Sequence, residues 1–362
     1  MGNKDKWISG YIKILSVFST WGKSDYFCRT FFFHHEFPIF AIMRSIQKII
    51  LFILLLTFTV SGVAQTGGLK NTEMLINLAE SYRNIDPDSA ILYGKIALEE
   101  CSQSGNKELM ARSQRSLGIT YFYQGEFNRS LECLDSGLVL YQISGNQKGI
   151  ANCLNTKALV YQKWAEYDSS LRLLEQSLHI RESLDDKEDI AISYLNLGNT
   201  YFYKSNFVSA LNYYFKAVVS YQELGLKTDM ADVYINIGVV YKQLENYEKA
   251  ITYLNFAERI YNENNAQMGL SRVYSNKAEI YNFDLNRYDE ALDLYQKALK
   301  IKKQFNNPSE IALMYNNIGT VYGNMAQYGA AFEMFEKSRK IYQQGGDIAG
   351  LIMVDYNMGK VK

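Results

Sequence analysis

A register of small residues that returns every forty positions constrains this chain more than any other feature of its sequence. Four segments, beginning at Leu117, Leu197, Ile237 and Ile318, show it most clearly: LGITYFYQGEFNRSL, LGNTYFYKSNFVSAL, IGVVYKQLENYEKAI and IGTVYGNMAQYGAAF. The small residue recurs, with five gaps of 40 residues and one of 41, as Gly118, Ala158, Gly198, Gly238, Ala278, Gly319 and Gly359. Self-similarity at such a period indicates a stacked array of supersecondary units.

Each unit is predicted to be a pair of helices. A tyrosine follows the small residue by three positions, at Tyr121, Tyr161, Tyr201, Tyr241, Tyr281 and Tyr322. The second half of most units holds small residues seven apart, as in Ala90 and Ala97, Ala210 and Ala217, Ala250 and Ala257, Ala291 and Ala298, and Ala331 and Ser338. Seven residues make about two helical turns, so each pair shares one face. We expect small side chains to let neighbouring helices approach closely while tyrosine rings fill the wider gaps.

This order of small residue, tyrosine, alanine and aromatic residue resembles the tetratricopeptide repeat, and NLGNTY at 196–201 is similar to that family's commonest form. The resemblance covers residues from about 71 to 362 and implies an all-α fold, a right-handed α-solenoid of about seven helix-turn-helix repeats plus a partial eighth. The unit departs from the family in having 40 residues rather than 34 and in lacking the proline that closes the second helix. Its length is similar to that of the longer-repeat subfamily. HEAT-type repeats share this length but lack the Gly/Ala and Tyr pattern.

The N-terminal region has a different composition. Within 43–64, Arg44 and Lys48 precede an apolar run at 49–60, and small residues follow up to Ala64. That order is typical of a cleaved secretory signal peptide or, if uncleaved, a signal anchor. We therefore expect an exported protein, periplasmic or anchored in the inner membrane, that touches the membrane only through this segment. The segment 1–42 shows no helical or strand period. Translation is predicted to start at Met43, and the alternative is a real tail before an anchor.

The solenoid is predicted to occupy 65–362. Its units span about 71–107, 108–147, 148–187, 188–227, 228–267, 268–308 and 309–348, with a partial unit at 349–362. The first unit is degenerate, with Ala79 and Tyr82 in place of the leading pair. Two interpretations of the last half-unit stay open: its lone helix caps the array, or the reading frame is truncated.

Ligands of tetratricopeptide folds lie along the first helices, on the inner wall. An asparagine precedes the small residue by two positions at Asn196, Asn236, Asn276, Asn317 and Asn357. By resemblance to members that bind extended peptides, these amides are candidates for a ladder that bonds a peptide backbone, because an amide both donates and accepts. The alternative is that they bond neighbouring helices. Aromatic residues are candidates for groove contacts or for packing at Phe122, Tyr123, Phe202, Tyr203 and Phe283.

Some chemistries are excluded or weakly supported. The family's carboxylate clamp is not carried over, because its basic positions hold Leu195 and Ile235, and the pair Arg112 and Arg115 is interpreted as a solvated face. Beyond residue 64 there are 31 basic and 35 acidic residues, which argues against nucleic-acid binding. His179 is the one histidine beyond residue 64. Without a nucleophile set, phosphate loop or metal-ligand spacing, the sequence predicts no enzyme, no cofactor and no metal.

Two functions follow from the resemblance. The first is a scaffold on the outer side of the bacterial inner membrane that holds a protein or peptide in its concave groove. The alternative is the sensor region of a membrane signal-transduction protein whose output module, a histidine kinase, cyclase or DNA-binding regulator, is missing. The sequence does not name the partner.

Overall fold

The computed structural model describes residues 65–361, and all its regular elements in that range are helices. The first helices of the units are α3 (Gln65–Tyr82), α5 (Lys107–Tyr123), α7 (Gln147–Lys163), α9 (Lys187–Tyr203), α11 (Lys227–Gln243), α13 (Gln267–Glu279) with the π-helix η1 (Ile280–Asp284), α15 (Pro308–Asn324) and α17 (Ile348–Val361). The second helices are α4 (Pro87–Ser104), α6 (Phe127–Ser144), α8 (Tyr167–Ser183), α10 (Phe207–Glu223), α12 (Tyr247–Glu263), α14 (Tyr288–Gln304) and α16 (Tyr328–Gly345).

Short turns with fixed chemistry divide these helices. In each turn after α4, the residue before the last has positive φ, as at Gly145 (72°) between units and Ala165 (59°) within a unit. Asparagine or aspartate then often caps the next helix: Asn146 accepts a hydrogen bond from the amide of Gly149 at 2.7 Å. Such caps satisfy backbone donors that a helix start leaves free. The turns therefore return each helix against the one before it.

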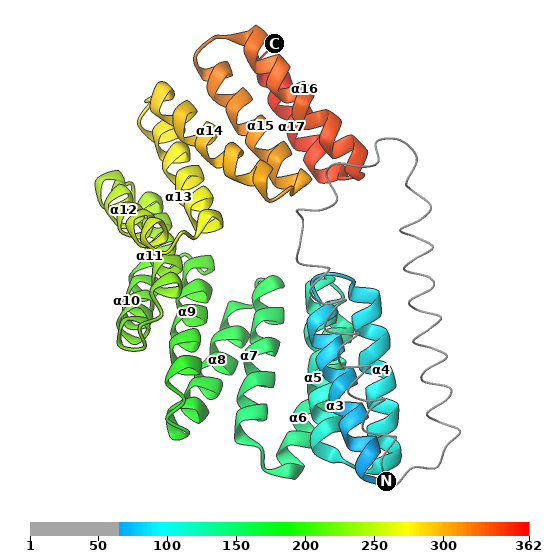
Figure 1. Cartoon of the computed structure of the whole chain (residues 1–362). Helices are drawn as coiled ribbons and strands as arrows, with labels where there is room; N and C mark the ends of the chain where they lie inside the picture. The colour runs from blue at the N-terminus through cyan, green and yellow to red at the C-terminus, as the bar shows by residue number, and fades with distance from the viewer. Residues whose placement is uncertain (1–64, 362) are drawn as a thin grey trace. The chain divides into compact units, whose positions relative to one another are not determined.

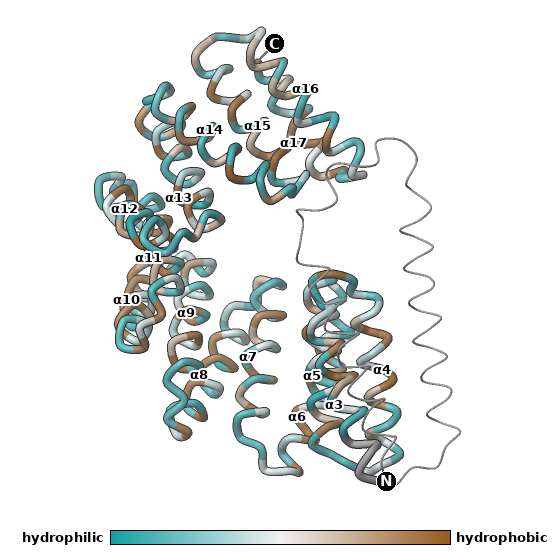
Figure 2. The backbone as a smooth tube through the Cα atoms, viewed as in Figure 1, coloured by the Kyte–Doolittle hydropathy of each residue, from teal (hydrophilic) through white to brown (hydrophobic). Residues whose placement is uncertain are grey.

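Helices pack in chain order, each against its neighbours in sequence (Figure 1). First helices of successive units also contact one another, as α5 contacts α7 and α15 contacts α17. Apolar and polar stretches alternate along single helices (Figure 2), so each helix can bury one face between its neighbours. The predicted fold class, an α-solenoid of helix-turn-helix repeats, is confirmed.

The small residues lie where the two helices of a unit are closest. A methyl group added to Gly238 would come within 2.9 Å of Leu254 Cγ, and one added to Gly198 within 2.5 Å of the Tyr214 ring. Ala250 on the second helix is fully buried. The same arrangement holds for glycine at positions Gly118 and Gly319, which face Leu134 and Phe335. Close approach thus depends on missing side-chain bulk.

The repeat tyrosines fill space beside these contacts. Tyr201 stacks on Tyr213 with ring centroids 5.4 Å apart, and Tyr241 stacks on Tyr253 at the same distance. Tyr121 is buried, whereas Tyr281 and Tyr322 are partly buried. Such offset rings add packing energy beyond the area that they bury.

The single gap of 41 residues has a structural counterpart. Unit six holds the extra residue, and its first helix ends in the five-residue π-helix η1. A π-turn takes up an inserted residue without breaking the helix, and such turns often occur at functional sites. The following helix α14 still buries Ala291 and Ala298 as the other second helices bury their small residues.

The predicted signal segment at 43–64 and the predicted start at Met43 lie outside the described residues. Within 65–361, no helix is both long enough and apolar enough to span a bilayer.

Candidate ligand-binding face

The first helices together form a surface, here called the first-helix face, that carries all five predicted asparagines. Three of these amides reach the preceding unit. Asn196 Nδ2 donates to Asn155 Oδ1 at 2.9 Å, and Asn236 Nδ2 donates to Asn199 Oδ1 at 3.3 Å. The third bond joins Asn357 Nδ2 to Asn316 Oδ1 at 3.0 Å. These three amides hold neighbouring first helices together.

The remaining two asparagines make different contacts. Asn276 Nδ2 donates to the carbonyl of Arg272, one turn earlier on the same helix, at 2.8 Å. Asn317 Oδ1 accepts a long hydrogen bond of 3.5 Å from the adjacent Asn316. Neither amide reaches another unit through the contacts found within 65–361. Helix linkage therefore accounts for three members of the asparagine row but not for Asn276 and Asn317, and the peptide ladder stays a prediction.

Asn276 and Asn317 line one pocket of about 390 Å³ between α13 with η1 and α15. Pockets that bind small ligands have volumes of this order. Tyr295 and Met314 form buried parts of its wall, while Phe283 is 57% exposed and Leu313 37% exposed. Apolar surface and two side-chain amides thus converge at one place on the first-helix face.

Charged groups around this pocket are paired within the protein. Arg272 binds Asp232 on α11 at 2.5 Å, and Glu279 accepts a hydrogen bond from Lys242. Lys302 Nζ lies 2.7 Å from Glu310 Oε2 and is buried. Because each charge has a partner, the pocket has the chemistry of an uncharged ligand group rather than of an ion.

The other predicted aromatic residues lie along the edge where first helices end. Phe202 packs against Tyr203 and Phe207, with ring centroids 5.7 Å and 5.9 Å away. Tyr203 remains 52% exposed. Phe202 therefore contributes to packing of the turn, and Tyr203 presents its ring to solvent.

Arg112 and Arg115 do not form a free basic pair. Arg112 Nη2 lies 2.8 Å from Glu80 Oε2 on α3, and the same carboxylate group lies 3.9 Å from Arg115. The hydrogen bond to Glu80 raises the pKa of Arg112. These arginines join the first two units instead of standing as a solvated face.

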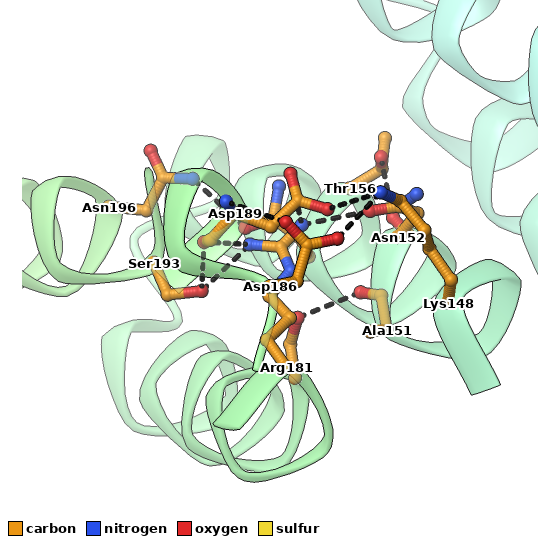
Figure 3. A network of polar contacts seen from close by, with 11 residues as sticks. Lys148, Ala151, Asn152, Thr156, Arg181, Asp186, Asp189, Ser193 and Asn196 are labelled. Carbon is orange, nitrogen blue, oxygen red and sulfur yellow. Dashed lines mark hydrogen bonds and ion pairs between the residues drawn. The ribbon is translucent and has the colours of Figure 1, made fainter. Parts of the chain in front are cut away.

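The most polar buried group was missed by sequence reasoning. Arg181, on α8, is only 3% exposed and bonds residues of the two neighbouring helices, α7 and α9 (Figure 3). Its Nη1 donates to the Asp189 carbonyl at 3.0 Å and to Ser193 Oγ at 2.7 Å, and Nη2 donates to Asn152 Oδ1 at 2.9 Å. Burial lowers the pKa of Arg181, although nearby Asp189 acts in the opposite direction. A signal existed: four other units place tyrosine at this position of the repeat, at Tyr141, Tyr221, Tyr261 and Tyr342.

Two kinds of group offer little reactive chemistry. Burial raises the pKa of the Cys153 thiol to about 12 and that of Cys133 to about 11, which disfavours the nucleophilic thiolate. His179 is exposed on α8. Among residues 65–361, no three His, Cys, Asp or Glu side chains gather as metal ligands do.

Stacked helix pairs with a continuous first-helix face define an α-solenoid of the helical-repeat class. The tetratricopeptide repeat model matches residues 109–183, 149–223, 189–263, 229–304 and 269–344. This chain belongs to the tetratricopeptide repeat family. Among curated proteins, no sequence matches it.

Solved structures share the fold at low sequence identity. A signal transduction ATPase with numerous domains and a tetratricopeptide repeat sensor, from Pyrococcus horikoshii, is 18% identical with a TM-score of 0.58, over 80% of this chain and 46% of that one. Aspartyl phosphate phosphatase F of Bacillus subtilis is 14% identical with a TM-score of 0.58, over 75% and 71%. The Rap conjugation regulator of plasmid pLS20, in complex with the Phr* peptide, is 14% identical with a TM-score of 0.55, over 79% and 78%. At these identities the likeness concerns the fold.

Proposed function

We propose that this chain is an exported scaffold that holds an extended peptide or protein segment on its first-helix face, with the pocket between α13 and α15 as the main contact. The observation that carries the proposal is the convergence of Asn276 and Asn317 on that pocket. Their amides have hydrogen-bonding capacity that the protein contacts described above do not use. The peptide complex formed by the Rap regulator supports this kind of ligand.

The location is proposed from sequence. The basic, apolar and small stretches of 43–64 support a location of the repeats on the outer side of the bacterial inner membrane, whether the segment is cleaved or retained. The test is fractionation of the bacterium that carries the protein, followed by protease treatment of spheroplasts. Digestion of the repeats in intact spheroplasts, or their release with the periplasmic fraction, is expected. Full protection inside spheroplasts would contradict the location without touching the binding proposal.

The binding proposal is tested with a library of random linear peptides presented to the full chain. Peptides that bind wild-type protein are expected to bind Asn276→Ala with Asn317→Ala at least tenfold more weakly, because each truncation removes a bond to the peptide backbone. Asn262→Ala is the matched control, since Asn262 is exposed on α12, a second helix. Equal thermal unfolding of the three proteins checks their folding. Unchanged peptide affinity in the double variant would refute this site.

A sensor region is the second candidate function. The Pyrococcus horikoshii protein favours it, because repeats of this fold serve there as a sensor within a longer chain. Reading the DNA downstream of the codon for Lys362 separates the two. A kinase, cyclase or DNA-binding sequence in frame there favours the sensor, and its absence favours the scaffold.

A further inference from the structure

The π-turn in unit six changes what the neighbouring pocket can recognise. We infer that this pocket accepts one large uncharged apolar side chain of an extended peptide, with Phe283 as the residue that determines this specificity. The inference rests on the proposed function and adds the chemistry of the bound residue. It starts from the position of η1, which carries Phe283 into the lining of the pocket together with Leu313 of α15.

The pocket has an apolar rim above an apolar floor. Phe283 and Leu313 expose 57% and 37% of their surface, whereas Tyr295 and Met314 below them are each 2% exposed. Ser275 Oγ donates a hydrogen bond to the Met314 sulfur at 3.5 Å. A large apolar side chain entering here would cover the two exposed residues, and removing apolar surface from water drives such binding.

The charges beside the pocket argue against an ionic side chain. Arg272, Glu279 and Lys302 already pair with Asp232, Lys242 and Glu310. A charged ligand group would lose its hydration without finding an unpaired opposite charge, and that desolvation is costly. The pocket therefore selects against lysine, arginine, aspartate and glutamate at the bound position.

The two amides supply the complementary contacts for the peptide backbone. Asn276 uses its Nδ2 on the carbonyl of its own helix, which leaves Oδ1 as an acceptor. Asn317 Oδ1 receives Asn316 Nδ2, and Asn316 is in turn bonded by Asn357. This leaves Asn317 Nδ2 as a donor. One acceptor and one donor flanking an apolar pocket match an extended residue, which has one N–H, one C=O and one side chain.

The experiment uses the full chain and the peptides selected from the random library. Bound peptides are expected to share one position occupied by tryptophan, phenylalanine, tyrosine, leucine or methionine, and alanine there should weaken binding at least tenfold. Phe283→Ala should weaken binding by a similar factor and make the alanine-substituted and parent peptides nearly equal in affinity. Such non-additivity is the signature of a direct contact.

Three further variants distinguish a direct contact of Phe283 with the peptide from a general loss of binding. Phe283→Leu keeps an apolar rim and should bind within threefold of wild type, whereas Phe283→Asp should lose binding. Tyr328→Ala, at an exposed tyrosine on α16, should have no effect. Peptides that bind without a shared apolar position, or that bind Phe283→Asp unchanged, would overturn the inference and leave the proposed function intact. A library that yields no binding peptide would overturn both.

Discussion

Where the second helix of one unit packs against the first helix of the next, a residue near the end of the former contacts the residue eight positions later. We call this contact a joint. The joint between α6 and α7 and the joint between α8 and α9 use different residue types for it. In the first, the Tyr141 ring lies over Gly149, where an added methyl group would come within 2.4 Å of ring carbon. In the second, the buried Arg181 takes the place of the tyrosine and Asp189 takes the place of the glycine. In both, eight residues separate the two positions.

Four further joints repeat these two arrangements or combine a residue from each. Tyr261 with Gly269 and Tyr342 with Gly350 repeat the ring-over-glycine contact, again at 2.4 Å. Lys302 with Glu310 repeats the ion pair. Tyr221 pairs with Asp229, and burial, followed by the charge of this carboxylate, raises the pKa of the tyrosine to about 12. The comparison teaches that the spacing is fixed by geometry, whereas the two residue types depend on each other: an arginine or lysine at the first position is joined by an acid at the second.

The largest expected effect comes from placing a cation in a ring joint. Tyr141→Arg would bury a guanidinium beside Arg115, which hydrogen-bonds Tyr141 in the wild type. Two like charges would then lie close together. An unpaired buried charge costs about 3–5 kcal/mol of unfolding free energy. Urea denaturation followed by circular dichroism measures this loss. Adding Gly149→Asp should recover a substantial part of this loss, because it creates at positions 141 and 149 an ion pair of the kind that Arg181 forms with Asp189. A double variant no more stable than the single one would break the comparison.

A smaller effect is expected when the ionic joint is changed. Arg181→Ala leaves the hydrogen-bonding groups of Asn152, Asp189 and Ser193 without this partner and should cost about 3 kcal/mol. Arg181→Tyr should cost less, about 1 kcal/mol, because Tyr221 with Asp229 already forms a joint of that composition. The same denaturation experiment compares them. Equal losses would mean that the tyrosine joint cannot be transferred between units.

Glycine in a ring joint gives the third effect. Gly149→Ala should destabilise the protein by about 1–2 kcal/mol, because overpacking against Tyr141 outweighs the alanine's better helix propensity. Gly329→Ala on α16 is the matched control, since its added methyl group meets nothing within 4 Å, and it should be neutral or stabilising. Thermal unfolding measures both. A stabilised Gly149→Ala protein would show that the ring does not need the glycine.

The smallest expected effect is a pH-dependent change in the free energy of unfolding at the joint between α8 and α9. A hydrogen bond from Lys148 at 2.6 Å lowers the pKa of Asp186, which caps α9 beside the ionic joint. A carboxylate with a lowered folded-state pKa stabilises the protein above its unfolded value, about 4, and this stability is lost as the pH falls through the folded value. Asp186→Asn should therefore be less stable than wild type at pH 7, and the difference should shrink as the pH falls below about 4. A difference that persists in acid would assign it to packing.

The sequence predicted the stacking of the helices better than it predicted the contacts of the site. The forty-residue register identified the positions of Gly238 and Ala250 because missing bulk is a property of the residue itself. The contacts of Asn196 and Asn276 depend on neighbours: Asn155 offers Asn196 an acceptor in the preceding unit, whereas Asn276 bonds its own helix. Identical residues at identical repeat positions thus acquire different roles.

Arg181 was missed for a related reason. A repeat is recognised by the residues that recur, and Arg181 replaces the tyrosine that recurs at this position. The acid eight residues later was visible in the sequence, but only the folded joint shows that the two positions meet. The 41-residue gap was likewise visible, while its form as a π-turn required the structure.

One inserted residue in an α-helix turns everything that follows by about 100°, enough to point an inward face sideways. The five residues of η1 take up that rotation, and the next unit still seats Phe335 against Gly319. Length changes at this point in the chain can therefore be accommodated locally. A repeat array can in this way acquire a new recognition feature in one unit while its other units keep their packing, so divergence of ligand preference does not require redesign of the whole stack.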